Sequence, residues 1–107
     1  MHKGDFPELM NLIIGVFHQD WSLVFDEWRT CLEYYVLKGG NPVGNKRLLN
    51  EITRMLGNLS NAEIEFFFRA NQAQIDPPFD ADMTYREWLQ EVQRMIFEDL
   101  ARRAENN

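Results

Sequence analysis

The sequence is poor in the residues that build disulfides, metal centres and phosphate-binding loops. Of its 107 residues, one is cysteine and two are histidine. The single thiol, Cys31, excludes an internal disulfide and a thiolate-rich metal site. The chain also has no glycine-rich phosphate loop, no His-Glu-x-x-His pair and no CxxC motif. We therefore predict that the protein binds no cofactor and is not an enzyme.

Basic charge is scarce, and long apolar runs are absent. The 17 acidic residues outnumber the 11 Lys and Arg residues, which gives a formal net charge of −6. Nucleic acids and anionic membranes attract proteins through basic residues, so neither is an expected partner. No apolar run approaches the ~20 residues of a membrane-spanning helix, and the first residues lack the apolar stretch of a signal peptide. We expect a cytoplasmic protein that favours a basic partner.

Strand-like alternation of apolar and polar residues is missing as well. Apolar residues instead recur at three- and four-residue steps, as they do on one face of a helix. We predict an all-α fold, a compact bundle of about five helices with one long acidic loop before the last helix. Residues 5–103 form the single predicted domain, whereas residues 1–4 and 104–107 are expected to fray.

The helix boundaries follow from capping signals. Asp5 is the predicted N-cap of the first helix, and Asn41 precedes Pro42 at the start of the third. Capping boxes begin the last two helices, Ser60 with Glu63 and Thr84 with Glu87. The second helix is predicted to run continuously over residues 23–38. Its expected buried stripe consists of Val24, Phe25, Trp28, Cys31, Leu32, Tyr35 and Val36.

Residues 73–83 are predicted to form the long loop. The Pro77-Pro78 pair is expected to exclude helix and to stiffen the segment. The segment carries Asp76, Asp80 and Asp82 without a compensating Lys or Arg. A long loop in a compact domain is often functional. The alternative is a solvated connector with Phe79 packed on the core.

The most unusual stretch is Phe17-His18-Gln19-Asp20-Trp21, between the first two apolar segments. A connection between helices is normally small or polar. Because this one is bulky, we expect its side chains to turn inward, with the polar groups of His18 and Asp20 hydrogen-bonded. Two alternatives stay open: a partner-binding patch, and a metal or hydrolase site built on His18 and Asp20. Residues two apart do not share a helix face, which disfavours the metal site.

Together with Asp76-Pro77-Pro78 and Thr84-Tyr85-Arg86-Glu87-Trp88-Leu89, this stretch resembles the small all-helical immunity proteins of contact-dependent growth inhibition systems. The resemblance covers roughly residues 6–100. It implies a cytosolic protein that binds the C-terminal toxin domain, commonly a nuclease, of a large effector. We expect a monomer in a one-to-one complex with a toxin domain whose active-site cleft is basic. The family-motif residues that the resemblance implies are structural: Phe17, His18, Gln19, Asp20, Trp21, Tyr85, Trp88 and Leu89.

The acidic composition suits such a partner, because carboxylates can occupy a cleft that attracts phosphate. The candidate toxin-binding residues come from the acidic loop and from the outer face of the second helix: Asp76, Phe79, Asp80, Asp82, Glu27, Glu33 and Tyr34. The alternative is that the acidic excess serves solubility alone. A second functional hypothesis is a non-enzymatic adaptor that binds another helical protein, or its own copy, through Phe66, Phe97 and Tyr34.

Overall fold

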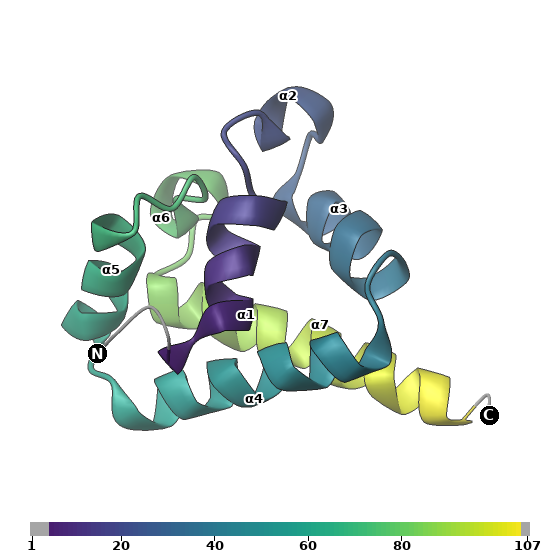
Figure 1. The fold of residues 1–107 in the computed structure, drawn as a ribbon. Helices are drawn as coiled ribbons and strands as arrows, with labels where there is room; N and C mark the ends of the chain where they lie inside the picture. The colour runs from purple at the N-terminus through teal and green to yellow at the C-terminus, as the bar shows by residue number, and fades with distance from the viewer. Residues whose placement is uncertain (1–4, 106–107) are drawn as a thin grey trace.

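The computed structural model describes residues 5–105, and within them all regular structure is helical (Figure 1). Two of the helices, α1 and α3, continue without interruption into wider π-helical turns, η2 and η3. The elements are α1 (Pro7–Met10), η2 (Asn11–Val16), α2 (Trp21–Val24), α3 (Trp28–Leu32), η3 (Glu33–Lys38), α4 (Pro42–Asn58), α5 (Asn61–Ala70), α6 (Pro77–Asp80) and α7 (Tyr85–Glu105). The all-α prediction is confirmed, but the predicted set of about five helices and a structureless loop is not.

The two longest helices, α4 and α7, pack against each other and form the base of the molecule (Figure 1). Local capping fixes where they begin. The Asn41 side chain accepts a hydrogen bond from the Gly44 N–H at 2.7 Å. Thr84 and Glu87 exchange hydrogen bonds of 3.1 and 2.9 Å at the start of α7. These predicted helix starts are confirmed, as is the capping box that opens α5.

The first helix is capped by a distant residue. The structure places Phe6, and not the predicted Asp5, at its N-cap, without a side-chain cap. The Glu51 carboxylate of α4 accepts hydrogen bonds from the backbone N–H groups of Glu8 and Leu9, at 3.1 and 2.9 Å. Because a helix leaves its first N–H groups without internal partners, this buried carboxylate does the work of a cap. It also fixes α1 on α4.

The predicted second helix is broken. Phe25 and Glu27 have extended backbones, which separates α2 from α3. The tryptophans on either side of the break are anchored at different places. Trp21 packs on Phe17 and Trp28 packs on Trp88. The break leaves Val24 exposed, so its predicted place in the buried stripe is wrong.

The same correction applies further along the stripe. Tyr35 is exposed and Phe25 is only half-buried, whereas the other members are buried as predicted: Trp28, Cys31, Leu32 and Val36. Leu37, which the stripe does not include, is buried too. The wider turns of η3 explain the exposure of Tyr35 and the burial of Leu37, because periodicity counted at the α-helical step misplaces residues in a π-helical segment. Phe25 lies before η3, at the break after α2.

The prediction that Pro77 and Pro78 exclude helix is wrong. They occupy the first turn of α6, where a missing N–H removes no helical hydrogen bond. Ile75, just before α6, is buried, but Phe79 is exposed. The alternative that packs Phe79 on the core is therefore wrong as well.

At the far end of the chain, α7 continues to Glu105, whereas the sequence predicts fraying from residue 104. The fraying predicted for residues 1–4 and for 106–107 concerns positions outside the described residues. Within residues 5–105, no helix combines the length and the apolar composition that crossing a membrane requires.

Candidate functional site

The two sequence motifs meet in the core. Phe17 packs edge-on against Trp88, with ring centroids 5.6 Å apart, and against Trp21 at 5.4 Å. Tyr85 packs against Phe68 at 5.0 Å, and Phe68 contacts Trp88 at 5.9 Å. The motif residues that the structure buries are Phe17, Trp21, Tyr85, Trp88 and Leu89. The apolar half of both motifs thus lies in one aromatic cluster.

The polar half of the first motif lies at the surface. Gln19 and Asp20 are exposed and His18 is half-buried. His18 Nδ1 accepts a hydrogen bond of 3.1 Å from the Asp20 backbone N–H, which closes a local turn. The expectation that the Asp20 side chain turns inward is wrong. No group of three His, Cys, Asp or Glu side chains within residues 5–105 is placed to hold a metal ion.

Trp21 connects two segments that are far apart in the sequence. Its indole Nε1–H donates to the Gln74 carbonyl oxygen at 3.3 Å, and the Gln74 N–H donates to the Ile13 carbonyl at 3.4 Å. The start of α2 is thereby tied to the segment that leads into α6. No pattern in the sequence indicates this link, because it joins an indole to a backbone carbonyl.

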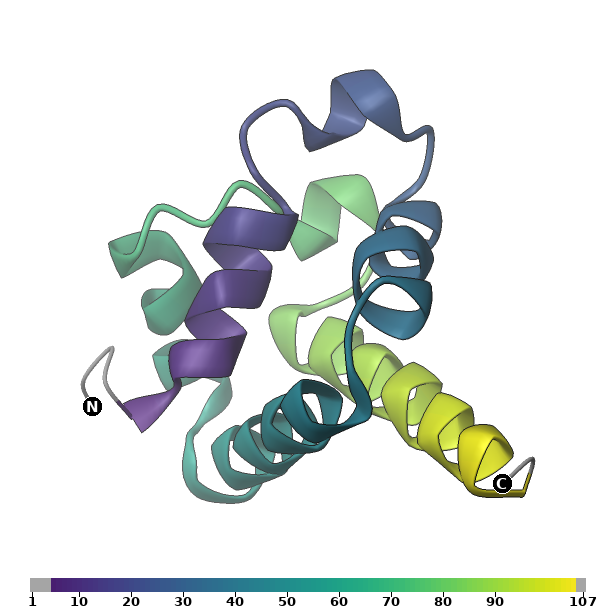
Figure 2. The ribbon, with the colours of Figure 1, turned by 45° about the vertical axis from the view of Figure 1, so that its right-hand side comes forward.

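As a result, α2, α6 and the beginning of α3 lie at the same end of the molecule, opposite α4 (Figures 1 and 2). We call this end, with residues 19–28 and 70–85, the acidic end. It contains six carboxylates and no Lys or Arg: Asp20, Asp26, Glu27, Asp76, Asp80 and Asp82. Removing these six from the 17 acidic residues of the chain leaves eleven, which equals the number of Lys and Arg residues. The net charge of the protein therefore resides at this end.

The arginines that border the acidic end are engaged elsewhere. Arg69 pairs with Glu65 at 3.2 Å. Arg86 donates to the carbonyl oxygens of Leu56 and Leu59 at 2.9 and 2.6 Å, which caps the end of α4. Neither guanidinium is directed at the six carboxylates by a hydrogen bond that would neutralise them.

The acidic end also carries exposed apolar side chains. Among the large hydrophobic side chains of the described residues, the three most exposed are Phe79, Leu23 and Val24, at 86%, 83% and 66%. Phe79 belongs to α6, and Leu23 and Val24 belong to α2. Of these, the sequence predicts a binding role for Phe79 and none for the α2 pair, because periodicity places Val24 in the core. The only signal for the α2 pair is the Asp26-Glu27 dipeptide that interrupts the apolar pattern just after it.

The α6 turn holds its carboxylates in fixed positions. The Asp80 carboxylate accepts a hydrogen bond of 2.7 Å from the Asp76 backbone N–H. Burial raises the pKa of Asp80, the hydrogen bond from Asp76 opposes that rise, and the nearby Asp76 charge adds to it. Asp82 adopts a left-handed backbone with φ of 54°, which ends the turn. The fold thus holds the Asp80 carboxylate in a partly desolvated position, where its charged form is less favourable than in water.

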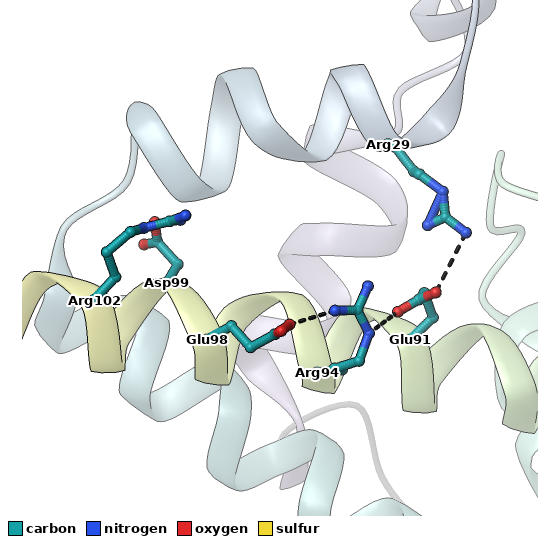
Figure 3. A network of polar contacts seen from close by, with 6 residues as sticks. All are labelled: Arg29, Glu91, Arg94, Glu98, Asp99 and Arg102. Carbon is teal, nitrogen blue, oxygen red and sulfur yellow. Dashed lines mark hydrogen bonds and ion pairs between the residues drawn. The ribbon is translucent and has the colours of Figure 1, made fainter.

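The face formed by α3 and α7 is different, because its charges are paired (Figure 3). Arg29 of α3 pairs with Glu91 of α7 at 3.3 Å, and Arg94 bridges Glu91 and Glu98. Asp99, which is buried, pairs with Arg102 at 3.0 Å. The carboxylates along this face are compensated and do not resemble those of the acidic end.

The predicted binding residues of the second helix are divided between these two surfaces. Glu27 is exposed at the acidic end, directly before α3. Glu33 instead lines a hollow beside Arg29, Arg94 and Arg102. Tyr34 is exposed and packs against Phe25 at 5.8 Å, next to the end of α2. The structure therefore brings Glu27 and the α6 carboxylates to one end of the molecule and leaves Glu33 on the paired face.

The residues proposed for an adaptor interface do not form one surface. Phe66, Phe97 and Tyr34 are all exposed. They belong to α5, α7 and η3, and α5 and η3 lie on opposite sides of α1 in both views (Figures 1 and 2). This arrangement removes the main support for the adaptor hypothesis.

The sequence matches a known protein family. Residues 5–96 match the model of a protein family described as CdiI immunity protein. The match spans every element from α1 to the larger part of α7 and includes both sequence motifs. Neither a curated protein nor a solved structure matches the chain.

Proposed function

This chain belongs to the CdiI immunity protein family, whose members neutralise toxins, and we propose that it does so by binding. Its target is the toxin domain of the cognate contact-dependent growth inhibition effector. We propose that this domain is a nuclease with a basic cleft, and that the two proteins form a one-to-one complex in the cytoplasm. The chain inhibits by covering the toxin and contributes no catalysis of its own.

The unbalanced charge of the acidic end is the observation that supports this proposal. A nuclease must attract phosphate, which it does with Lys and Arg. Carboxylates that are not paired within their own protein are free to meet such a surface, and complementary charge accelerates association. The residues proposed to contact the toxin are Asp76, Phe79, Asp80, Asp82 and Glu27, with Tyr34 beside them. Glu33 lies among arginines, so we leave it out of this set.

The test is a neutralisation experiment with the toxin domain encoded beside this chain. The two proteins are co-expressed with a tag on the toxin domain alone, and we expect the immunity protein to co-purify at equal stoichiometry. Adding the purified immunity protein to the toxin domain should abolish its nuclease activity at a one-to-one ratio. A toxin domain from an unrelated system serves as the control and should keep its activity. Absence of a complex with the cognate domain would refute the proposal.

A further inference from the structure

Building on the proposed toxin-binding function, we propose that α2 anchors the toxin. In this arrangement Leu23 and Val24, together with Phe79 of α6, insert into an apolar surface of the toxin domain that is rimmed by Lys and Arg. The carboxylates of the acidic end meet that rim. Leu23, Val24 and Phe79 would then make the contacts that slow dissociation. Of these three, only Phe79 is among the toxin-binding residues predicted from the sequence.

The exposure of these side chains is unusual in its grouping. Single exposed hydrophobic residues are normal on protein surfaces. Here, however, the three most exposed ones lie on two short helices at one end of the molecule. Protein interfaces typically combine an apolar centre with a polar rim, and a few centrally placed side chains carry most of the binding energy. Leu23, Val24 and Phe79, with six carboxylates on the flanking residues, match that composition.

The α2 helix is held firmly although it is short. At its first residue, Trp21 is buried against Phe17 and donates its hydrogen bond to the Gln74 carbonyl. Just after its last residue, Phe25 packs against Tyr34 and Tyr35 with ring centroids 5.8 and 5.7 Å away. A side chain presented in a fixed position loses less conformational entropy on binding. Phe17 and Trp21 of the first family motif therefore fix the position of α2, which carries Leu23 and Val24.

Charge decides what covers this surface. A second copy of the chain would bring six carboxylates against six others, which disfavours self-association. An anionic membrane is repelled for the same reason. A basic protein surface is attracted, and its own apolar centre can accept Leu23 and Val24. The surface thus fits a basic protein with an apolar depression.

The experiment compares two double variants that remove equal kinds of exposed apolar surface. Leu23→Ala with Val24→Ala alters the proposed anchor, and Val43→Ala with Phe97→Ala alters exposed side chains on α4 and α7. Binding to a catalytically inactive form of the cognate toxin domain is measured by surface plasmon resonance. We expect the anchor variant to bind about 100-fold more weakly, mainly through faster dissociation, with the association rate within about 3-fold of wild type. The control variant should bind as wild type does.

The outcomes separate this inference from the function on which it rests. If the wild-type chain does not bind the toxin domain, the proposed function fails. If the wild type binds and the anchor variant binds equally well, the anchor assignment is overturned while the function stands. Loss of affinity in the control variant alone would place the interface on α4 and α7. If the wild type sediments as a dimer that the anchor variant dissolves, a second copy occupies this surface and the inference is wrong. Circular dichroism melts of both variants verify that they fold.

Discussion

At the scale of single residues, Glu51 shows how a buried charge can organise this fold. A carboxylate removed from water is destabilising unless hydrogen bonds compensate for the lost hydration. Here the compensation comes from the N–H groups of Glu8 and Leu9, at the positive end of the α1 dipole. The hydrogen bonds compensate the Glu51 carboxylate for its lost hydration, and they give the first N–H groups of α1 the acceptors that the helix itself lacks.

Replacing Glu51 should therefore be costly. We expect Glu51→Ala to lower the free energy of unfolding by about 3 kcal/mol, because two N–H groups lose their acceptor and a void forms. Glu51→Gln keeps one acceptor oxygen and should lose less. Urea unfolding followed by circular dichroism measures both. Asn50→Ala, at an exposed neighbouring position of α4, is the control and should change little. Wild-type stability in Glu51→Ala would contradict the capping role.

Cys31 is the second residue with a clear expectation. It is fully buried, and burial raises the pKa of its thiol to about 11. Because the thiolate is the reactive form, the folded protein should react slowly with a disulfide reagent near pH 8, and the urea-unfolded protein should react at once. The pKa is higher in the folded than in the unfolded chain. The unfolding free energy should consequently fall as the pH rises from 9.0 towards about 11. Equal labelling rates with and without urea would contradict this expectation.

At the scale of elements, α6 places the Asp80 carboxylate in a partly buried position, where its negative charge lowers the free energy of unfolding. Burial raises the pKa of Asp80, so its charged form is disfavoured in the folded state. A raised pKa means that stability contributed by this group declines as the pH rises through the folded value. Asp80→Asn abolishes that decline. We expect the unfolding free energy of the variant, relative to wild type, to increase from about pH 4 to neutral pH. Urea titrations at both ends of the range test this, and a difference that shrinks with pH would contradict it.

The same scale shows which features the sequence could predict. The starts of α4, α5 and α7 depend on residues within one turn, so the Asn41-Pro42, Ser60–Glu63 and Thr84–Glu87 signals locate them correctly. The start of α1 is capped by the distant Glu51, which no local signal indicates. The break after α2 depends on where Trp21 and Trp28 find their partners in the tertiary structure. Periodicity reports spacing along the chain and carries no information about such partners.

The candidate site also has features that the sequence predicts and features that depend on tertiary contacts. The charges of Asp76, Asp80 and Asp82 follow from composition, and the absence of nearby basic residues marked that segment in advance. The exposure of Leu23 and Val24 does not follow, because an apolar residue at helical spacing is normally in the core. The gathering of both segments at one end depends on the Trp21–Gln74 hydrogen bond, which joins residues far apart in the chain.

At the scale of the whole molecule, the excess negative charge lies at one end, and the charges of the rest of the molecule balance. Outside the acidic end, acidic and basic residues are equal in number, and the α3–α7 face pairs its members directly. The long-range electrostatic field of the protein therefore arises mainly from the negative charge of the acidic end. A basic partner approaching in solution is oriented by that field before any contact forms.

Neutralising part of this charge should slow association with the toxin domain. Asp80→Asn with Asp82→Asn removes two charges from the acidic end, and Asn tolerates the left-handed backbone at position 82. We expect the association rate to fall about five-fold at about 20 mM salt, with little difference at about 0.5 M, where the field is screened. Glu98→Gln with Glu105→Gln removes the same charge from α7 and should have a much smaller effect. Equal slowing by both pairs would show that the net charge, and not its position, steers the toxin.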